Sequence, residues 1–116
     1  MANKCLLFTY DKFQPASAPP RSASQFWRDQ IRGELYDLGG LLVAVRIGRS
    51  AELIDGFVAE IDVDELVDLD GLLDTESREF VRRTSTTEKG FEVYVYEYGR
   101  SIPEENVRVL PAKTVP

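Results

Sequence analysis

Residues 32–48, RGELYDLGGLLVAVRIG, decide how this chain is expected to fold. From Ile31 to Tyr36, small or apolar residues alternate with polar or aromatic ones, which is the period-2 pattern of a half-buried strand. The Gly-Gly pair at 39–40 interrupts this pattern, and glycine adopts the positive φ of a turn at no steric cost. Leu41–Val45 is entirely apolar and short enough for a strand buried on both faces. The stretch therefore predicts a β-hairpin with a Tyr-Asp pair at its mouth.

The composition narrows the class of protein and of partner. The chain has 116 residues, 43% hydrophobic and 29% charged, as expected for one domain over residues 1–116 with its own core. A net charge of −6 argues against nucleic acid and against anionic membranes, because both are bound through a surplus of Lys and Arg. No apolar run reaches membrane-spanning length and no signal pattern opens the chain, so a cytoplasmic location is expected.

The residue types also limit the chemistry. One cysteine and no histidine exclude an internal disulfide and Ser-His or Cys-His nucleophiles, and they argue against a zinc site. A calcium loop aligned on Gly71 has Leu66 and Ser77 where carboxylates are needed, so it is rejected. We expect no metal and no cofactor. Any general acid or base must then be a carboxylate, a lysine or a tyrosine.

Several short strands and a helix are expected outside the central hairpin. Strands are predicted over residues 5–10, 53–61, 80–87 and 91–98, with another around 107–110. Gly56 lies inside one of them and marks a close approach of two backbones or a bulge. The Pro-, Ser- and Ala-rich residues 11–24 predict a loop, and Gln25–Gln30 a short helical turn.

The helix is expected to begin at Asp62, because Asp62 and Glu65 have the spacing of a capping box. Its apolar face is formed by leucines at helical spacing: Leu66, Leu69, Leu72 and Leu73. Together these elements predict an α+β fold in which a mixed sheet curls toward a small barrel, with one or two helices.

Six pieces of the chain, in order, resemble the gamma-glutamylcyclotransferase-like family in its small, avirulence-induced-gene type. LLFTYDKF at 6–13 stands where the family has a strand ending in Tyr-Gly-x-Leu, with Asp11 replacing the glycine and Phe13 the leucine. The other pieces are GELYDLG at 33–39, GFV at 56–58, LDGLL at 69–73, Phe80 with Arg82, and VYVY at 93–96. The resemblance spans about residues 5–98 and implies the family's fold.

The resemblance also implies an activity and a site. In this family a glutamate acts as general acid/base while the substrate's own amine attacks its γ-carbonyl, releasing 5-oxoproline. The matching position is Leu73, which cannot transfer a proton, and Asp74, Glu76 and Glu79 stand nearby. The family's loop binds the glutamyl group through backbone N–H groups, and some members place a tyrosine where this chain has Phe80.

We therefore expect a small-molecule ligand, γ-glutamyl or similar, with cyclotransferase activity weak or altered. The alternative is a non-catalytic member that binds a ligand or a protein through the same cavity. Asp74 and Glu76 are the candidate catalytic residues, although a solvated residue near the helix C-terminus is the simpler interpretation of Asp74. Tyr94, Tyr96 and Tyr98 either line a pocket or cover the sheet. The candidate ligand-binding residues are Tyr10, Asp11, Lys12, Phe13, Tyr36, Gly39, Phe80 and Tyr96.

Overall fold

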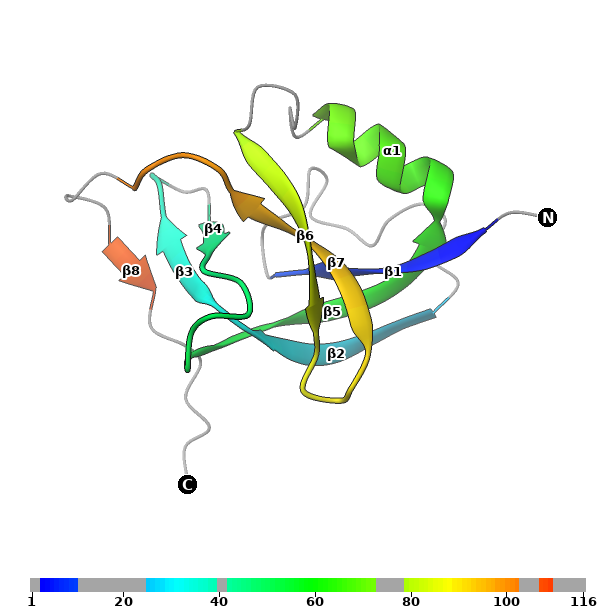
Figure 1. Cartoon of the computed structure of the whole chain (residues 1–116), viewed down its shortest axis with the longest axis horizontal. Helices are drawn as coiled ribbons and strands as arrows, with labels where there is room; N and C mark the ends of the chain where they lie inside the picture. Colours follow the sequence, from blue (N-terminus) through cyan, green and yellow to red (C-terminus); the bar gives the residue numbers. More distant parts are fainter. Residues whose placement is uncertain (1–2, 11–24, 40–41, 73–78, 103–106, 110–116) are drawn as a thin grey trace.

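The computed structural model describes residues 3–10, 25–39, 42–72, 79–102 and 107–109. These residues form strands and one helix, as the α+β prediction required (Figure 1). The elements in chain order are β1 (Lys4–Thr9), β2 (Gln25–Arg32), β3 (Glu34–Asp37), β4 (Leu42–Val45), β5 (Leu53–Asp62), α1 (Val63–Leu72), β6 (Phe80–Thr86), β7 (Glu92–Tyr98) and β8 (Val107–Val109).

The large sheet has five strands in the order β2-β5-β1-β7-β6. All its neighbours are antiparallel except β1 and β7, which run parallel with Leu7 beside Tyr94, so the sheet is mixed as predicted. β5 is the longest strand and is paired along its length with β2 on one side and β1 on the other. The first strand of the chain therefore lies in the middle of this sheet.

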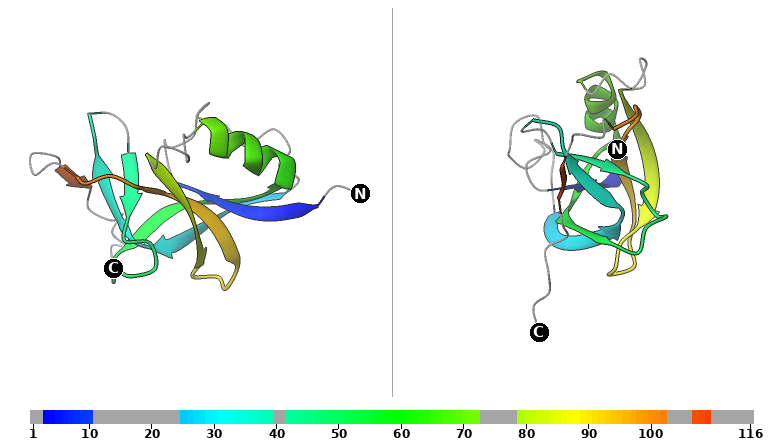
Figure 2. Two further views of the ribbon diagram at one scale, coloured as in Figure 1. Left: turned by 45° about the horizontal axis from the view of Figure 1, so that its top comes forward. Right: turned by 90° about the vertical axis from the view of Figure 1, so that its left-hand side faces the viewer.

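The small sheet has three antiparallel strands in the order β4-β3-β8 and contains the predicted hairpin. Leu35 pairs with Ala44 and Tyr36 with Val43, and Val43 and Ala44 are fully buried, as expected for an apolar strand. The chain passes from β2 to β3 at Gly33, whose N–H donates to the Glu52 carbonyl at 3.0 Å. In the described part of the chain the expected curl is therefore made by two sheets and not by a closed barrel (Figure 2).

The core occupies both sides of the large sheet, and one part of it lies on the side that faces β4. Tyr10 is the largest fully buried side chain, and its hydroxyl accepts from Ala44 N at 3.3 Å and donates to the Tyr96 carbonyl at 2.9 Å. Glu97 makes a second link, because its buried carboxylate accepts the Ile47 N–H at 2.9 Å. These two side chains tie the small sheet to β7 through hydrogen bonds as well as apolar packing.

The close approach predicted at Gly56 is confirmed. A Cβ atom on Gly56 would lie 2.2 Å from the carbonyl oxygen of Thr9 and 2.6 Å from the ring of Phe8. Real Cβ atoms do not approach other atoms so closely, so only glycine allows β1 and β5 their present separation.

Two local predictions were wrong. Gln25–Gln30 is not a helical turn but the first six residues of β2, paired with β5 along its length. Leu72 does not belong to the apolar face of α1: Leu66 is buried and Leu69 half-buried, but Leu72 is 68% exposed. The helix does start where expected, directly after Asp62, whose carboxylate lies 2.7 Å from Lys4 Nζ. Leu41 and Leu73 are outside the described residues.

Candidate functional site

Helix α1 lies over one side of the large sheet, and contacts and strand register show which residues face it (Figures 1 and 2). The Tyr96 hydroxyl lies 3.2 Å from the Leu66 carbonyl of α1, so Tyr96 points toward the helix. Arg82 is opposite Tyr96 in the β6–β7 register, and paired residues share a face of a sheet. Tyr94, two residues before Tyr96, is on the same face. We call this face the helix-facing side.

The register extends the helix-facing side across β1, β5 and β2. Because Leu7 lies beside Tyr94, Thr9 lies beside Tyr96. Thr9 pairs with Phe57, which in turn pairs with Arg28 on β2. At the β2 end of this series of paired residues, the Arg28 guanidinium lies 5.8 Å from the ring centroid of Phe57. Polar and aromatic residues of all five strands thus share one face of the sheet.

The most connected polar group on this side joins α1 to the sheet. Asp70, in the last turn of α1, accepts the Tyr96 hydroxyl at Oδ1 over 2.7 Å. Its other oxygen, Oδ2, lies 2.9 Å from Nη1 of Arg82. The Arg82 guanidinium also lies 5.1 Å from the ring centroid of Tyr94. An aspartate, an arginine and a tyrosine from three elements are therefore held in one arrangement, which we call the Asp70 cluster.

The electrostatics of the Asp70 cluster assign its members different roles. Burial, together with the hydrogen bond to Asp70 and its negative charge, raises the pKa of Tyr96 well above the ordinary tyrosine value. Tyr96 therefore keeps its proton at neutral pH and acts as a hydrogen-bond donor, not as a base. Arg82 balances the charge of Asp70, so the two side chains form a pair with no net charge. Both remain partly accessible, with 24% of Asp70 and 34% of Arg82 exposed.

Outside the Asp70 cluster, the buried carboxylates of Asp29 and Glu97 have structural partners. Burial alone would raise the pKa of Asp29, but hydrogen bonds outweigh it and hold the pKa below the ordinary value. Their donors are the Thr87 hydroxyl, the Gln30 and Lys89 amides and the Trp27 indole. Glu97 likewise accepts Arg83 Nε at 3.1 Å. Within the described ranges, no three acidic or sulfur ligands come together to hold a metal ion.

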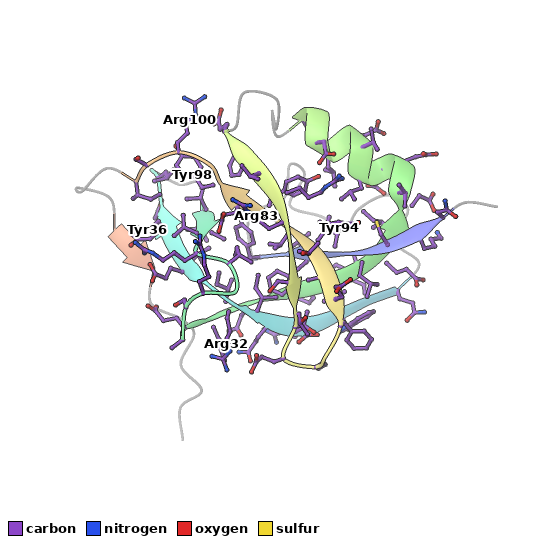
Figure 3. All side chains as sticks on the ribbon, viewed as in Figure 1. Arg32, Tyr36, Arg83, Tyr94, Tyr98 and Arg100 are labelled. Atoms are coloured by element: carbon purple, nitrogen blue, oxygen red, sulfur yellow. The ribbon has the colours of Figure 1, made fainter. Side chains whose placement is uncertain are left out.

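The predicted ligand-binding residues divide into three groups. Phe80 and Tyr96 come together on the helix-facing side, where Phe80 packs edge-on against Tyr98 at 5.6 Å. Tyr10 points to the opposite side, into the core, so its side chain packs there and only its backbone adjoins the site. Tyr36 and Gly39 belong to the small sheet and its turn, and Figure 3 shows Tyr36 far from Tyr94. Asp11, Lys12, Phe13, Leu73, Asp74 and Glu76 lie outside the described residues.

Comparison with known proteins identifies the fold. No protein-family model and no curated protein sequence matches the chain. The solved structure of the uncharacterized protein PH0828 from Pyrococcus horikoshii aligns with a TM-score of 0.63 and 18% identity, over 89% of this chain and 85% of that one. A gamma-glutamyl cyclotransferase aligns with a TM-score of 0.60 and 16% identity, over 91% of this chain and 72% of that one. The chain has the gamma-glutamyl cyclotransferase fold. The fold expected from the resemblance is thereby confirmed.

Within this gamma-glutamyl cyclotransferase fold, sequence reasoning missed two features of the helix-facing side. Thr9 was overlooked in favour of Tyr10, although strict alternation along β1 allows only one of them to face α1. Asp70 appeared only within the piece LDGLL at 69–73 and was given no role, because its partners Arg82 and Tyr96 come from strands that follow it in the chain. The sequence did contain a signal: Asp70 lies on the leucine side of the helix, and Arg82 lies among the aromatic residues of the strands.

The helix of the described part is too short and too polar to cross a bilayer.

Proposed function

We propose that this protein binds a γ-glutamyl or similar small amine-bearing molecule on the helix-facing side, and that its cyclotransferase activity is weak or altered. The observation that carries the proposal is the Asp70 cluster, in a fold shared with a gamma-glutamyl cyclotransferase. It places a carboxylate, a guanidinium and a phenol beside the end of β1, where the resemblance puts the ligand-binding loop. Such a set of polar groups suits a small polar ligand.

The same cluster supports weak turnover over efficient catalysis. Cyclisation forms a bond between the substrate's α-nitrogen and the carbon of its γ-carbonyl group, and it breaks the bond from that carbonyl carbon to the leaving amine. A proton must pass from the attacking nitrogen to the leaving nitrogen, so a general acid/base is needed. Asp70 is held in an ion pair with Arg82 at 2.9 Å, and Tyr96 stays protonated. Neither group suits the task, and the base role remains with the predicted Asp74 and Glu76.

The test is release of 5-oxoproline from γ-glutamyl amino acids, γ-glutamyl amines and glutathione. We expect binding by calorimetry with slow or undetectable release by the wild type. Leu73→Glu restores the carboxylate that the resemblance implies and is expected to raise the rate, whereas Leu73→Gln, of similar size and uncharged, is not. Efficient release by the wild type that persists in the double variant Asp74→Asn, Glu76→Gln would contradict this assignment.

The alternative is a protein of this fold that binds its ligand without any reaction. This alternative is favoured by the hydrogen bond of Asp70 with Tyr96 and its ion pair with Arg82. A carboxylate held in this way can orient a ligand even though it does not transfer a proton. Absence of 5-oxoproline from both the wild type and Leu73→Glu, together with measurable binding, would identify this alternative as correct. Absence of binding as well would remove both functions.

A further inference from the structure

The Asp70–Arg82 ion pair has hydrogen-bonding capacity and exposed surface beyond the contact that joins its two members. Arg82 contacts Asp70 through Nη1, and a guanidinium carries five N–H donors. Asp70 accepts the Tyr96 hydroxyl at Oδ1 and contacts Arg82 at Oδ2. With 24% and 34% of their side chains exposed, both groups remain within reach of a ligand.

We propose that this pair binds the α-amino acid head group of the ligand, with the ammonium at Asp70 and the carboxylate at Arg82. The inference rests on the proposed function and names the part of the ligand that the site recognises. It assigns the head group to side chains of α1 and β6, in addition to the backbone loop that the resemblance implies.

Charge complementarity favours a zwitterion over either single charge. The pair has no net charge, and neither has an α-amino acid head group at neutral pH. A lone carboxylate approaching Arg82 meets repulsion from Asp70, and a lone ammonium at Asp70 meets repulsion from Arg82. Only a group with both charges satisfies both residues, so rejection of the wrong ligands is part of the specificity.

The arrangement is also fixed before the ligand arrives. Tyr96 holds one oxygen of Asp70, and the ring of Tyr94 lies 5.1 Å from the centre of the Arg82 guanidinium. Side chains held in this way lose little conformational entropy on binding. The Asp70 carboxylate further favours the charged form of the ligand's amine. An ammonium is not a nucleophile, so this mode of binding itself slows cyclisation.

The experiment compares three ligands that share one γ-acyl alanine body. The first is γ-glutamyl-alanine, the second is glutaryl-alanine, which lacks the amine, and the third is 4-aminobutyryl-alanine, which lacks the α-carboxylate. Calorimetric titration of the wild type is expected to give the tightest binding for γ-glutamyl-alanine, by about 10-fold to 100-fold, as for loss of one charged hydrogen bond.

Neutral variants of similar shape should change the affinities for the three ligands in different ways. An ion pair with only a structural role would not give such a ligand-dependent pattern. Asp70→Asn should lower the affinity for γ-glutamyl-alanine by about 10-fold or more. The affinity for glutaryl-alanine should stay equal or increase, because the repulsion between Asp70 and the ligand's carboxylate is removed. Arg82→Gln should lower the affinity for γ-glutamyl-alanine to a similar degree, and it should leave the affinity for 4-aminobutyryl-alanine equal or higher. The matched control is Arg83→Gln, which removes the neighbouring arginine of β6 on the opposite face of the sheet and should change none of the three affinities.

Two results would overturn the inference: Asp70→Asn and Arg82→Gln lower the affinities for all three ligands equally, or they lower none of them. In either case γ-glutamyl binding by the wild type would still stand. Should the wild type bind free L-glutamate with this dependence on Asp70 and Arg82 but no γ-glutamyl compound, the head-group assignment holds and the proposed function fails. If a variant does not fold, NMR of the wild type decides. A shift of the Arg82 Nε–H resonance with γ-glutamyl-alanine but not with 4-aminobutyryl-alanine supports the assignment, and no shift contradicts it.

Discussion

Replacing Gly56 by alanine should severely destabilise the large sheet. The added Cβ would lie 2.2 Å from the Thr9 carbonyl oxygen, and β5 is hydrogen-bonded on both sides, so the backbone cannot move away without breaking a ladder. Overpacking of a well-packed interior costs about 1–3 kcal/mol, and a clash with backbone belongs at or above the upper end, about 3 kcal/mol. At roughly 4 °C per kcal/mol for a chain of this size, the melting temperature should fall by roughly 12 °C.

Two other glycines provide matched controls for the same substitution. Gly71 is in α1, and no described residue outside its own helix places an atom within 4 Å of where its Cβ would lie. Gly71→Ala should therefore stabilise the protein by about 0.5–1 kcal/mol through helix propensity. Gly33→Ala would bring the Cβ to 2.9 Å from Ile54 Cδ1, a side-chain atom that can shift, and should cost less than Gly56→Ala. Urea unfolding followed by circular dichroism measures all three. A Gly56→Ala protein within roughly 1 kcal/mol of the wild type would refute the steric argument.

Three further predictions concern buried polar groups. Tyr10→Phe leaves the Ala44 N–H without its acceptor and should cost about 1–3 kcal/mol of unfolding free energy, measured by urea denaturation; no loss would contradict the role of that hydroxyl. Glu97→Ala should cost a similar amount, whereas Arg83→Ala should cost under about 1 kcal/mol because its guanidinium is half exposed, and equal losses would reverse this ranking. The pKa of Asp29 lies below the ordinary 3.8, so its contribution to stability is complete above that pH and is lost as the pH falls through the lowered pKa. Asp29→Asn should remove this part of the acid dependence in urea midpoints measured from neutral to strongly acidic pH, and an unchanged dependence would contradict it.

The parts of the fold predicted from sequence are those in which local pattern and burial agree. The hairpin of β3 and β4, the strand β5 with its glycine, and the β6–β7 pair all show a regular pattern with a turn between strands. β2 was missed because Asp29 occupies a buried position between Trp27 and Ile31, where a carboxylate hides the alternation. Donors from the distant β6–β7 turn help to satisfy that carboxylate, and no local pattern reveals them.

Tertiary placement decides which part of the site was predicted. Tyr96 and Phe80 belong to strands with clear periodicity, so their side of the sheet followed from the spacing. The Asp70 cluster depends on where α1 lies relative to β6 and β7, which is a tertiary property. Leu72 illustrates this as well: its spacing suits the apolar face, but its side chain is 68% exposed.

The central place of β1 has a consequence for how the protein is made. During synthesis β1 emerges before both of the strands that flank it, since Thr9 contacts a residue 48 positions later and Tyr10 one 86 positions later. Among the described strands, only β3 with β4 and β6 with β7 form pairs that are close in the chain, so these hairpins are the described segments able to form early. Chains dominated by distant pairings fold slowly, on the order of milliseconds to seconds. The sheet closes only after β7 has been synthesised, and until then the apolar β1 is exposed to chaperones and to pairing with other chains.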